Sequence, residues 1–312
     1  MRLIIHHWDT DGICSASMLY EEGDINISPK IGNYFLENDE IEEIRNGNYD
    51  EIVVADVALN PDTMKKLAEI SKVKVFDHHH TKKVENIEYI NPIMEGMKEE
   101  EWPSASWVVA THMNKTDNFL AFLGVVGDWE DRIKNTSFYP FLESFMKKHE
   151  LNLKKMCEMA YIIDANYKIG DKAEVEKAVR LLHNSVNPAD FIMSNRLWKK
   201  RKMKIEEEIE KAVENEEKRI GRIIIKEIDS PYNIISTVAR KIWKGKEYVV
   251  VVNCGYFKDD CQVYVRGKDA IPLIKMALAK GYVAGGKKNV MGAIVPKEKC
   301  KEFVEKIVEM IK

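Results

Sequence analysis

The first third of the chain alternates short apolar runs with segments of helical periodicity, and this alternation limits the possible folds most strongly. The apolar runs at 2–7, 51–55 and 72–76 predict strands, and the segments 12–22 and 61–71 predict helices between them. Strands that are separated by helices favour a parallel sheet with helices on both faces. We therefore predict an α/β fold and expect any ligand site at the carboxyl ends of its strands.

The rest of the chain predicts a helical segment, a long connecting helix and a second α/β domain. Residues 104–190 have mostly helical patterns, with a break expected at the Gly-Asp pair 127–128. The charged segment 196–222 contains few apolar residues and predicts an exposed helix, because the sustained heptads of a coiled coil are lacking. We expect a parallel-sheet domain at 1–195 and a smaller α/β domain at 223–312, joined by this linker helix.

Composition is that of a folded protein without membrane spans. The 312 residues suggest about two domains, and the hydrophobic fraction of 45% excludes a disordered chain. No segment approaches the roughly 18 apolar residues of a membrane span, and early charge and histidine argue against a signal peptide. The five scattered cysteines form no C-x-x-C pair, which argues against a disulfide framework or a zinc site. We expect a cytoplasmic protein in a reducing compartment.

The net charge of −3 hides a difference between two parts of the chain. Residues 223–312 hold 17 Lys and Arg against 10 Asp and Glu, a net charge of +7. Residues 1–222 hold 31 against 41, a net charge of −10. An acidic part that holds cations and a basic part that holds an anion would suit a metal-dependent enzyme for an anionic substrate. An unevenly charged, solvated surface is the simpler interpretation of the charge alone.

Four short polar segments contain the candidate catalytic residues. They are residues 7–12 (HWDTDG), Asp56, residues 77–80 (DHHH) and residues 127–131 (GDWED). Three of them follow apolar, strand-like runs, so a parallel sheet would bring them to one edge. Carboxylates collected there repel one another, and bound divalent cations are the simplest remedy. Mixed His and carboxylate ligands favour a first-row metal such as Mn²⁺ over Ca²⁺ or Mg²⁺.

Each segment has a less specific interpretation when it is taken alone. A strand-end Asp is more often a turn former or helix cap than a ligand, and consecutive histidines occur in exposed turns. Because neighbouring strand residues point to opposite faces, we expect His6 to pack and His7 to face the site. We expect His80 to be peripheral. The combination of the four segments in this order favours a shared metal site.

These motifs resemble those of the DHH phosphoesterase superfamily. The resemblance comprises H-x-D-x-D-G at 7–12, the strand-end Asp56, the DHH signature at 77–79 and G-D at 127–128. Within the superfamily, the chain is most similar to RecJ-like nucleases and oligonucleotide phosphodiesterases of archaeal type. The segment 196–222 would supply the connecting helix of that family. The oligonucleotide-binding domain of the larger RecJ enzymes is expected to be absent.

The resemblance implies two manganese ions per active site, with Mg²⁺ or Co²⁺ as possible substitutes. Such a pair activates a shared water and clamps the attacking and leaving oxygens of an in-line displacement. Asp56 would bridge the two ions. The other ligands of the first ion would be His7 and Asp9. The other ligands of the second ion would be Asp11, His78 and Asp128.

Further residues near the motifs would act without binding metal. Asp77 would orient a metal-ligating imidazole through a hydrogen bond rather than bind metal itself. His79 would contact the scissile phosphate, where it would stabilise developing charge or protonate the leaving oxygen. No covalent intermediate is required, so Cys14 is expected to pack in the core. Ser104 or Ser106 is expected to cap the helix that follows Pro103.

The smaller domain resembles the DHH-associated domain, although less closely. The family's G-G-H-x-x-A-A-G element corresponds to residues 285–292, where Lys287 replaces the histidine. The two glycines would let backbone N–H groups approach a phosphate, whereas a plain surface turn is the alternative. Arg266 matches a strand-end arginine that meets phosphate, with an exposed arginine as the alternative. The expected substrate-binding residues are Arg266, Gly285, Gly286, Lys287, Lys288 and Asn289.

The resemblance implies a manganese-dependent phosphodiesterase that trims single-stranded DNA or RNA, or short oligonucleotides, from one end. One alternative is a hydrolase of cyclic or linear dinucleotides, such as cyclic di-AMP or pApA, or of 3′-phosphoadenosine 5′-phosphate. Inorganic pyrophosphatase activity is another. A non-catalytic scaffold of a replication complex is a third, which the intact motif carboxylates argue against. The sequence leaves open the polarity, the protein partners and whether the protein is a monomer or a homodimer.

Overall fold

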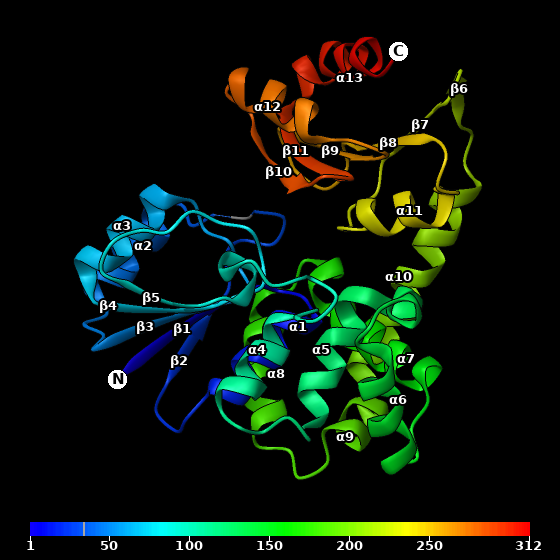
Figure 1. Cartoon of the computed structure of the whole chain (residues 1–312). Coiled ribbons are helices and arrows are strands. Elements are labelled where there is room, and N and C mark those ends of the chain that lie inside the picture. Colours follow the sequence, from blue (N-terminus) through cyan, green and yellow to red (C-terminus); the bar gives the residue numbers. More distant parts are fainter. Residues whose placement is uncertain (34) are drawn as a thin grey trace. The chain divides into compact units, whose positions relative to one another are not determined.

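The computed structural model describes residues 1–33 and 35–312, and the chain forms two compact units (Figure 1). The first unit comprises Met1–Tyr167 and Asp171–Lys202, and the second comprises Lys168–Gly170 and Met203–Lys312. The division falls inside helix α10 (Arg196–Glu214), which ends before residue 222, the predicted end of the linker helix. Among the described residues, no helix is long and apolar enough to cross a membrane.

The first unit is built on a parallel sheet of five strands in the order β2-β1-β3-β4-β5. Each pair of neighbouring strands is parallel, with β1 between β2 and β3 and β4 between β3 and β5. The predicted α/β fold is confirmed. The strands are β1 (Arg2–His6), β2 (Ile25–Ile27), β3 (Glu51–Ala55), β4 (Lys72–Phe76) and β5 (Ile87–Ile90).

Both faces of this sheet are covered, because its strands are apolar on both sides. Leu3 and Ile5 of β1 point to the face covered by α2 (Asn38–Asn46) and α3 (Pro61–Ile70), where they pack in one buried cluster. Ile4 lies between them and is also fully buried. Its face is the one next to α1 and α4, which contact β1 and β4 (Figure 1).

Helix α1 packs against α4, α5 and α8 of the first unit, and α1 and α5 carry part of the site. The predicted break at 127–128 is wrong, because α5 runs through this pair and ends at Trp129. Gly127 allows α5 to pack closely on α1, since a Cβ at this position would lie 2.8 Å from the Cβ of Thr10. The helices are α1 (Thr10–Leu19), α4 (Ala105–His112), α5 (Phe119–Trp129), α6 (Tyr139–Lys148), α7 (Leu153–Ile169), α8 (Lys172–His183) and α9 (Pro188–Ser194), with short 3₁₀ turns at Pro92–Glu95 and Glu130–Asn135.

The second unit is a mixed sheet of six strands in the order β10-β11-β9-β8-β7-β6. Only β7 and β8 run parallel, and the other neighbours are antiparallel. Its strands are β6 (Lys218–Ile220), β7 (Ile223–Ile228), β8 (Tyr248–Asn253), β9 (Asp260–Arg266), β10 (Val283–Lys287) and β11 (Val290–Pro296). Its helices are α11 (Ile235–Ile242), α12 (Ile271–Ala279) and α13 (Lys297–Ile311). One face packs on α10 and α11, and the other packs on α12 and α13.

One disulfide is present in the second unit, although the cysteine pattern argued against a disulfide framework. Cys254 and Cys261 form a disulfide across the β8–β9 pair, with their Cα atoms 4.2 Å apart. Antiparallel pairing of Asn253 with Gln262 places the two cysteines opposite each other. Strand pairing alone brings the two cysteines together. Their spacing in the sequence matches no cysteine motif, so the sequence did not predict this pair. Cys14, as predicted, is buried and free.

Candidate metal centre

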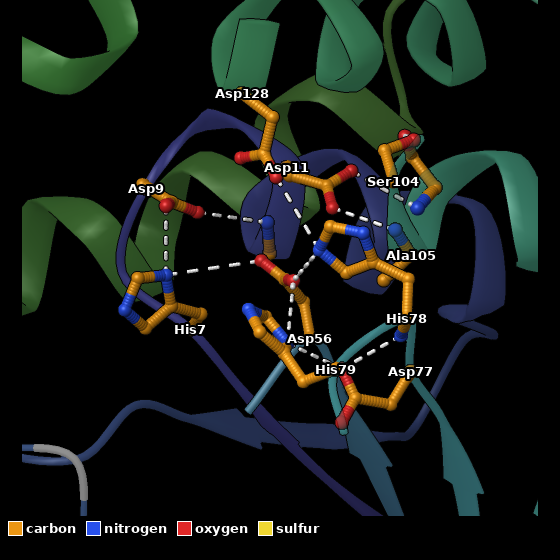
Figure 2. Close-up of polar contacts among 12 residues, drawn as sticks. His7, Asp9, Asp11, Asp56, Asp77, His78, His79, Ser104, Ala105 and Asp128 are labelled. Atoms are coloured by element: carbon orange, nitrogen blue, oxygen red, sulfur yellow. Dashed lines mark hydrogen bonds and ion pairs between the residues drawn. The ribbon is translucent and has the colours of Figure 1, made fainter. Parts of the chain in front are cut away.

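The carboxyl ends of three adjacent strands supply half of the site. His7 follows β1, Asp56 follows β3 and Asp77 follows β4, and these strands are neighbours in the sheet. Figure 2 shows their side chains gathered at one edge, below the N-terminal end of α1. Parallel strands that end together place the next residues side by side, which is why the motifs converge.

Helix α1 begins inside the first motif and positions two carboxylates. Asp9 is its N-cap and accepts a hydrogen bond from the backbone N–H of Gly12 at 3.1 Å. Asp11 lies in the first turn, where a carboxylate is favoured by the helix dipole. Glycine is required at position 12, because a Cβ there would lie 2.3 Å from the carbonyl oxygen of His7.

Asp11 is held by the N-terminus of a second helix. Its two carboxylate oxygens accept the backbone N–H groups of Ala105 at 2.7 Å and Ser106 at 3.0 Å. Ser104 caps this helix, α4, by accepting from the N–H of Trp107, as expected from the sequence. The N-terminus of α4 therefore fixes Asp11, and each of its oxygens keeps a lone pair for a cation.

Asp56 occupies the centre of the cluster. Its Oδ1 lies 3.5 Å from Nε2 of His78, and its Oδ2 lies 3.7 Å from Nδ1 of His7. The residue is 2% exposed and has a φ of +59°, a left-handed conformation that is uncommon and costs energy for residues other than glycine. A strained, buried carboxylate with each oxygen turned to a different imidazole is suited to bridge two cations.

The donor atoms form overlapping groups, each with atoms within 4.8 Å of one another. Nε2 of His78 also lies 3.3 Å from Oδ2 of Asp128, in the last turn of α5. The groups are His7, Asp9 and Asp56; Asp11, His78 and Asp128; and Asp56, His78 and His79. All six residues expected as ligands are therefore brought together, and their donor set of carboxylate oxygens and imidazole nitrogens fits first-row divalent cations.

Crowding of these groups shifts their pKa values. Burial and then the nearby Asp128 raise the pKa of Asp11 to about 6. Burial and the neighbouring carboxylates, Asp11 foremost, raise the pKa of Asp56 well above its ordinary value. Burial opposes ionisation of both Asp9 and His7, but their ion pair at 2.8 Å outweighs it, lowering the pKa of Asp9 and raising that of His7. Divalent cations would relieve this excess of negative charge.

The DHH signature places its acid against the second histidine. Oδ1 of Asp77 lies 2.7 Å from Nδ1 of His79 and accepts the backbone N–H of His78 at 2.9 Å. The imidazole that Asp77 orients is thus His79 rather than the candidate ligand His78. Of the flanking histidines, His6 is buried against Asn26, and burial lowers its pKa to about 4. His80 is exposed and peripheral, as expected.

The model of the DHH family N-terminal domain matches residues 2–126. The chain carries a DHH-family domain. The match includes the first three motifs, and Asp128 lies two residues beyond its end. A comparison with curated protein sequences found no match.

Solved structures share the fold over almost the whole chain. A DHH-domain protein described as a member of a family of ribosomal proteins is 16% identical, with a TM-score of 0.75 and coverage of 99% of this chain and 86% of that one. An exonuclease RecJ bound to manganese is 17% identical, with a TM-score of 0.63 and coverage of 97% and 88%. RecJ from Thermus thermophilus in complex with Mn²⁺ is 16% identical, with a TM-score of 0.65 and coverage of 97% and 51%. The DHH domain and the second unit together thus have the fold of RecJ-like proteins.

The residues expected to bind substrate lie together in the second unit. Arg266 ends β9 opposite Val290 of β11, and it is 6% exposed, so the alternative of an exposed arginine is wrong. Its guanidinium lies over the ring of Trp243, 4.9 Å from the ring centre. The backbone N–H of Gly267 donates to the carbonyl of Asn289, which ties the β10–β11 turn to the end of β9.

The Gly-Gly-Lys-Lys segment is a strand and hairpin turn rather than an isolated loop. Gly285, Gly286 and Lys287 belong to β10, the edge strand of the second sheet, and pair with β11. Lys288 and Asn289 form the turn between these strands, and both are exposed. The sequence did not predict β10, because a strand with two consecutive glycines has low β-propensity.

One residue near the metal ligands was not found from the sequence. Asp164 of α7 contacts Thr10, which stands between Asp9 and Asp11. It lies in the middle of a helical pattern, far along the chain from the motifs, and no motif or spacing marks it.

Proposed function

We propose that the protein is a two-metal phosphodiesterase that shortens single-stranded nucleic acid or short oligonucleotides and uses Mn²⁺. The observation that carries this proposal is the central position of Asp56 between two groups of donor atoms. RecJ, whose fold the chain shares, is an exonuclease with structures that contain Mn²⁺. The gathered carboxylates and imidazoles of this chain support a proposal of the same reaction class.

The groups of neighbouring donor atoms suggest which cation each candidate ligand would bind. His7 and Asp9 would hold one cation together with Asp56, and Asp11, His78 and Asp128 would hold the second, also with Asp56. Two bound cations supply an activated water and neutralise charge on the attacking and leaving oxygens. The chain's own contribution is to fix these six donors from strand ends and helix termini, so that little reorganisation is needed on binding.

His79 is the residue proposed to act on the substrate. Asp77 accepts from Nδ1–H of His79, which fixes the tautomer and stabilises the imidazolium. Its other nitrogen, Nε2, then carries the proton that is delivered to the leaving oxygen. His79 is half-buried, whereas Asp77 is fully buried, so the histidine is the accessible member of the pair.

Arg266 is proposed to bind a substrate phosphate. No carboxylate among the described residues pairs with it, and its Nε makes no hydrogen bond there. A buried guanidinium without an anion is costly, and a phosphate that accepts from the planar fork would remove this cost. Lys288 and Asn289 on the neighbouring turn, with Gly285, Gly286 and Lys287 of β10 beside them, would add charge and backbone donors.

A length series tests the proposed activity. The protein is incubated with Mn²⁺ and end-labelled DNA and RNA from dinucleotide to 20-mer, with either the 5′ or the 3′ end labelled. Progressive shortening of the 20-mer is the expected result. Cleavage of dinucleotides alone would instead support a dinucleotide hydrolase, and release of phosphate from pyrophosphate alone would support a pyrophosphatase.

Asp56→Ala is the variant that separates the mechanism from contaminating nuclease. Loss of the bridging carboxylate is expected to lower kcat at least about 100-fold, because both cations lose a ligand. Asp62→Ala, which removes an exposed carboxylate from the first turn of α3, is the control and should cleave like the wild type. Unchanged cleavage by Asp56→Ala would refute the two-metal mechanism.

A further inference from the structure

Thr10 stands between two proposed metal ligands and is held by a carboxylate from another helix. Its backbone N–H donates to Oδ1 of Asp164 at 3.0 Å, and its Oγ1 lies 2.7 Å from the same oxygen. Oγ1 also lies 3.1 Å from the carbonyl oxygen of Ala160. Thr10 is 1% exposed and Asp164 is 8% exposed, so solvent does not compete for these bonds. The first residue of α1 is therefore fixed to α7 by both its main chain and its side chain.

Thr10 also contacts the helix that carries a third proposed ligand. It packs against Gly127 of α5, where a Cβ would lie only 2.8 Å from its own Cβ. Gly127 directly precedes Asp128 in the sequence. The position of Thr10 thus sets the spacing between Asp9 and Asp11 on one side and Asp128 on the other.

We propose that Asp164 is a positioning residue for the metal centre, acting through Thr10 on Asp9 and Asp11. The inference rests on the proposed function, because it assumes that these carboxylates bind the cations. Partners behind the ligands hold ligating carboxylates in place, and their loss typically weakens metal affinity or activity about 10- to 100-fold. Asp164 differs from an ordinary helix cap because the residue that it holds is flanked on both sides by ligands.

Mn²⁺ affinity is the readout, because a purely structural role would not change it. Calorimetric titration of metal-free Asp164→Ala with Mn²⁺ should give a Kd about 10- to 100-fold above that of the wild type. Its cleavage activity should be restored in part by excess Mn²⁺. Thr10→Val, which keeps the shape but loses the hydroxyl, should weaken binding in the same direction. Thr10→Ser, which keeps the hydroxyl, should bind nearly as the wild type does.

The control is another carboxylate of the same unit that supports a helix away from the ligands. Asp171 caps α8 by accepting from the N–H of Glu174 at 2.9 Å, and it pairs with Arg201. Asp171→Ala should lower the thermal midpoint without changing the Kd for Mn²⁺. If Asp164→Ala behaves like this control, or if Thr10→Val binds Mn²⁺ like the wild type, the inference is wrong.

The same titrations separate this inference from the proposed function. If the wild type binds Mn²⁺ but cleaves no phosphodiester, the proposed function fails while the Kd values still decide the role of Asp164. If Asp164→Ala does not fold, the two Thr10 variants decide the question. A wild type that binds no Mn²⁺ would overturn both proposals.

Discussion

At the scale of single residues, the candidate metal centre contains features that are expected to destabilise the metal-free protein. Asp56 combines a left-handed backbone conformation with full burial beside other carboxylates. Each of these features costs free energy in the absence of cations. Residues that break local rules in this way are expected at functional sites. A variant that lacks these features should therefore have a measurably different free energy of unfolding in the absence of metal.

Asp56→Asn should make the metal-free protein more stable than the wild type near pH 8. Asn lacks the buried charge and adopts positive φ readily, so the variant is expected to have the higher free energy of unfolding. Urea unfolding in EDTA measures it. Mn²⁺ should stabilise the wild type but not the variant. A variant that is less stable than the wild type without metal would contradict the assignment.

Asp11 should make the metal-free protein sensitive to pH. Its pKa is about 6 in the folded state and near 3.8 in the unfolded chain, so the folded state binds the proton more tightly. Stability is therefore lost as pH rises from about 4 to about 7, by about 2–3 kcal/mol for this group. Unfolding curves in EDTA for the wild type and Asp11→Asn should diverge over this range. Parallel curves would show that Asp11 keeps an ordinary pKa.

The convergence of the candidate ligands could be predicted from the sequence, whereas their supporting contacts could not. His7, Asp56 and Asp77 follow strands, and strand ends of a parallel sheet meet by geometry alone. The pairing of Asp77 with His79 depends on the conformation of the chain after β4, which sequence pattern does not fix. Asp164 reaches Thr10 only because α7 packs on α1, and helix packing between distant segments leaves no local signal.

At the scale of elements, strands and helices with clear periodicity were predicted within a few residues. The strands Glu51–Ala55 and Lys72–Phe76 have the predicted bounds. The errors arose where tertiary packing overrides local preference. Helix α5 continues through a Gly-Asp pair because α1 packs closely on it, and α10 ends at Glu214 because β6 (Lys218–Ile220) then pairs with β7.

Strand β10 should tolerate a side chain at only one of its two glycines. A Cβ on Gly286, which has a φ of +148°, would lie 2.1 Å from the carbonyl oxygen of Val290. A Cβ on Gly285 would meet nothing within 4 Å. Gly286→Ala should therefore destabilise the protein by more than about 1 kcal/mol, while Gly285→Ala should stay within about 0.5 kcal/mol of the wild type. Thermal unfolding of both variants measures the difference.

The oligonucleotide affinity of the Gly285→Ala and Gly286→Ala variants tests the phosphate site proposed for β10 and its turn. If backbone N–H groups at these glycines bind phosphate, Gly285→Ala should weaken oligonucleotide binding although the fold is intact. Equal affinity of Gly285→Ala and the wild type would restrict the phosphate contacts to Arg266, Lys287 and Lys288.

At the scale of the whole molecule, the chain joins an acidic unit that gathers carboxylates with a basic C-terminal part. Residues 1–222 have a net charge of −10, and residues 223–312 have a net charge of +7. The α/β class was predictable because both parts repeat strand and helix patterns. The exact boundary between the two units was not predictable from the sequence. The three residues Lys168–Gly170 at the end of α7 belong to the second unit, although the residues on either side belong to the first.

The proposed dinuclear centre is tested most directly by anomalous diffraction from crystals of the full chain grown with Mn²⁺. We expect two manganese peaks, one bounded by His7, Asp9 and Asp56 and the other by Asp11, Asp56, His78 and Asp128. The same crystals of Asp56→Ala should lose at least one peak. No manganese peak between these side chains of the wild type, at a concentration that saturates activity, would contradict the proposed site.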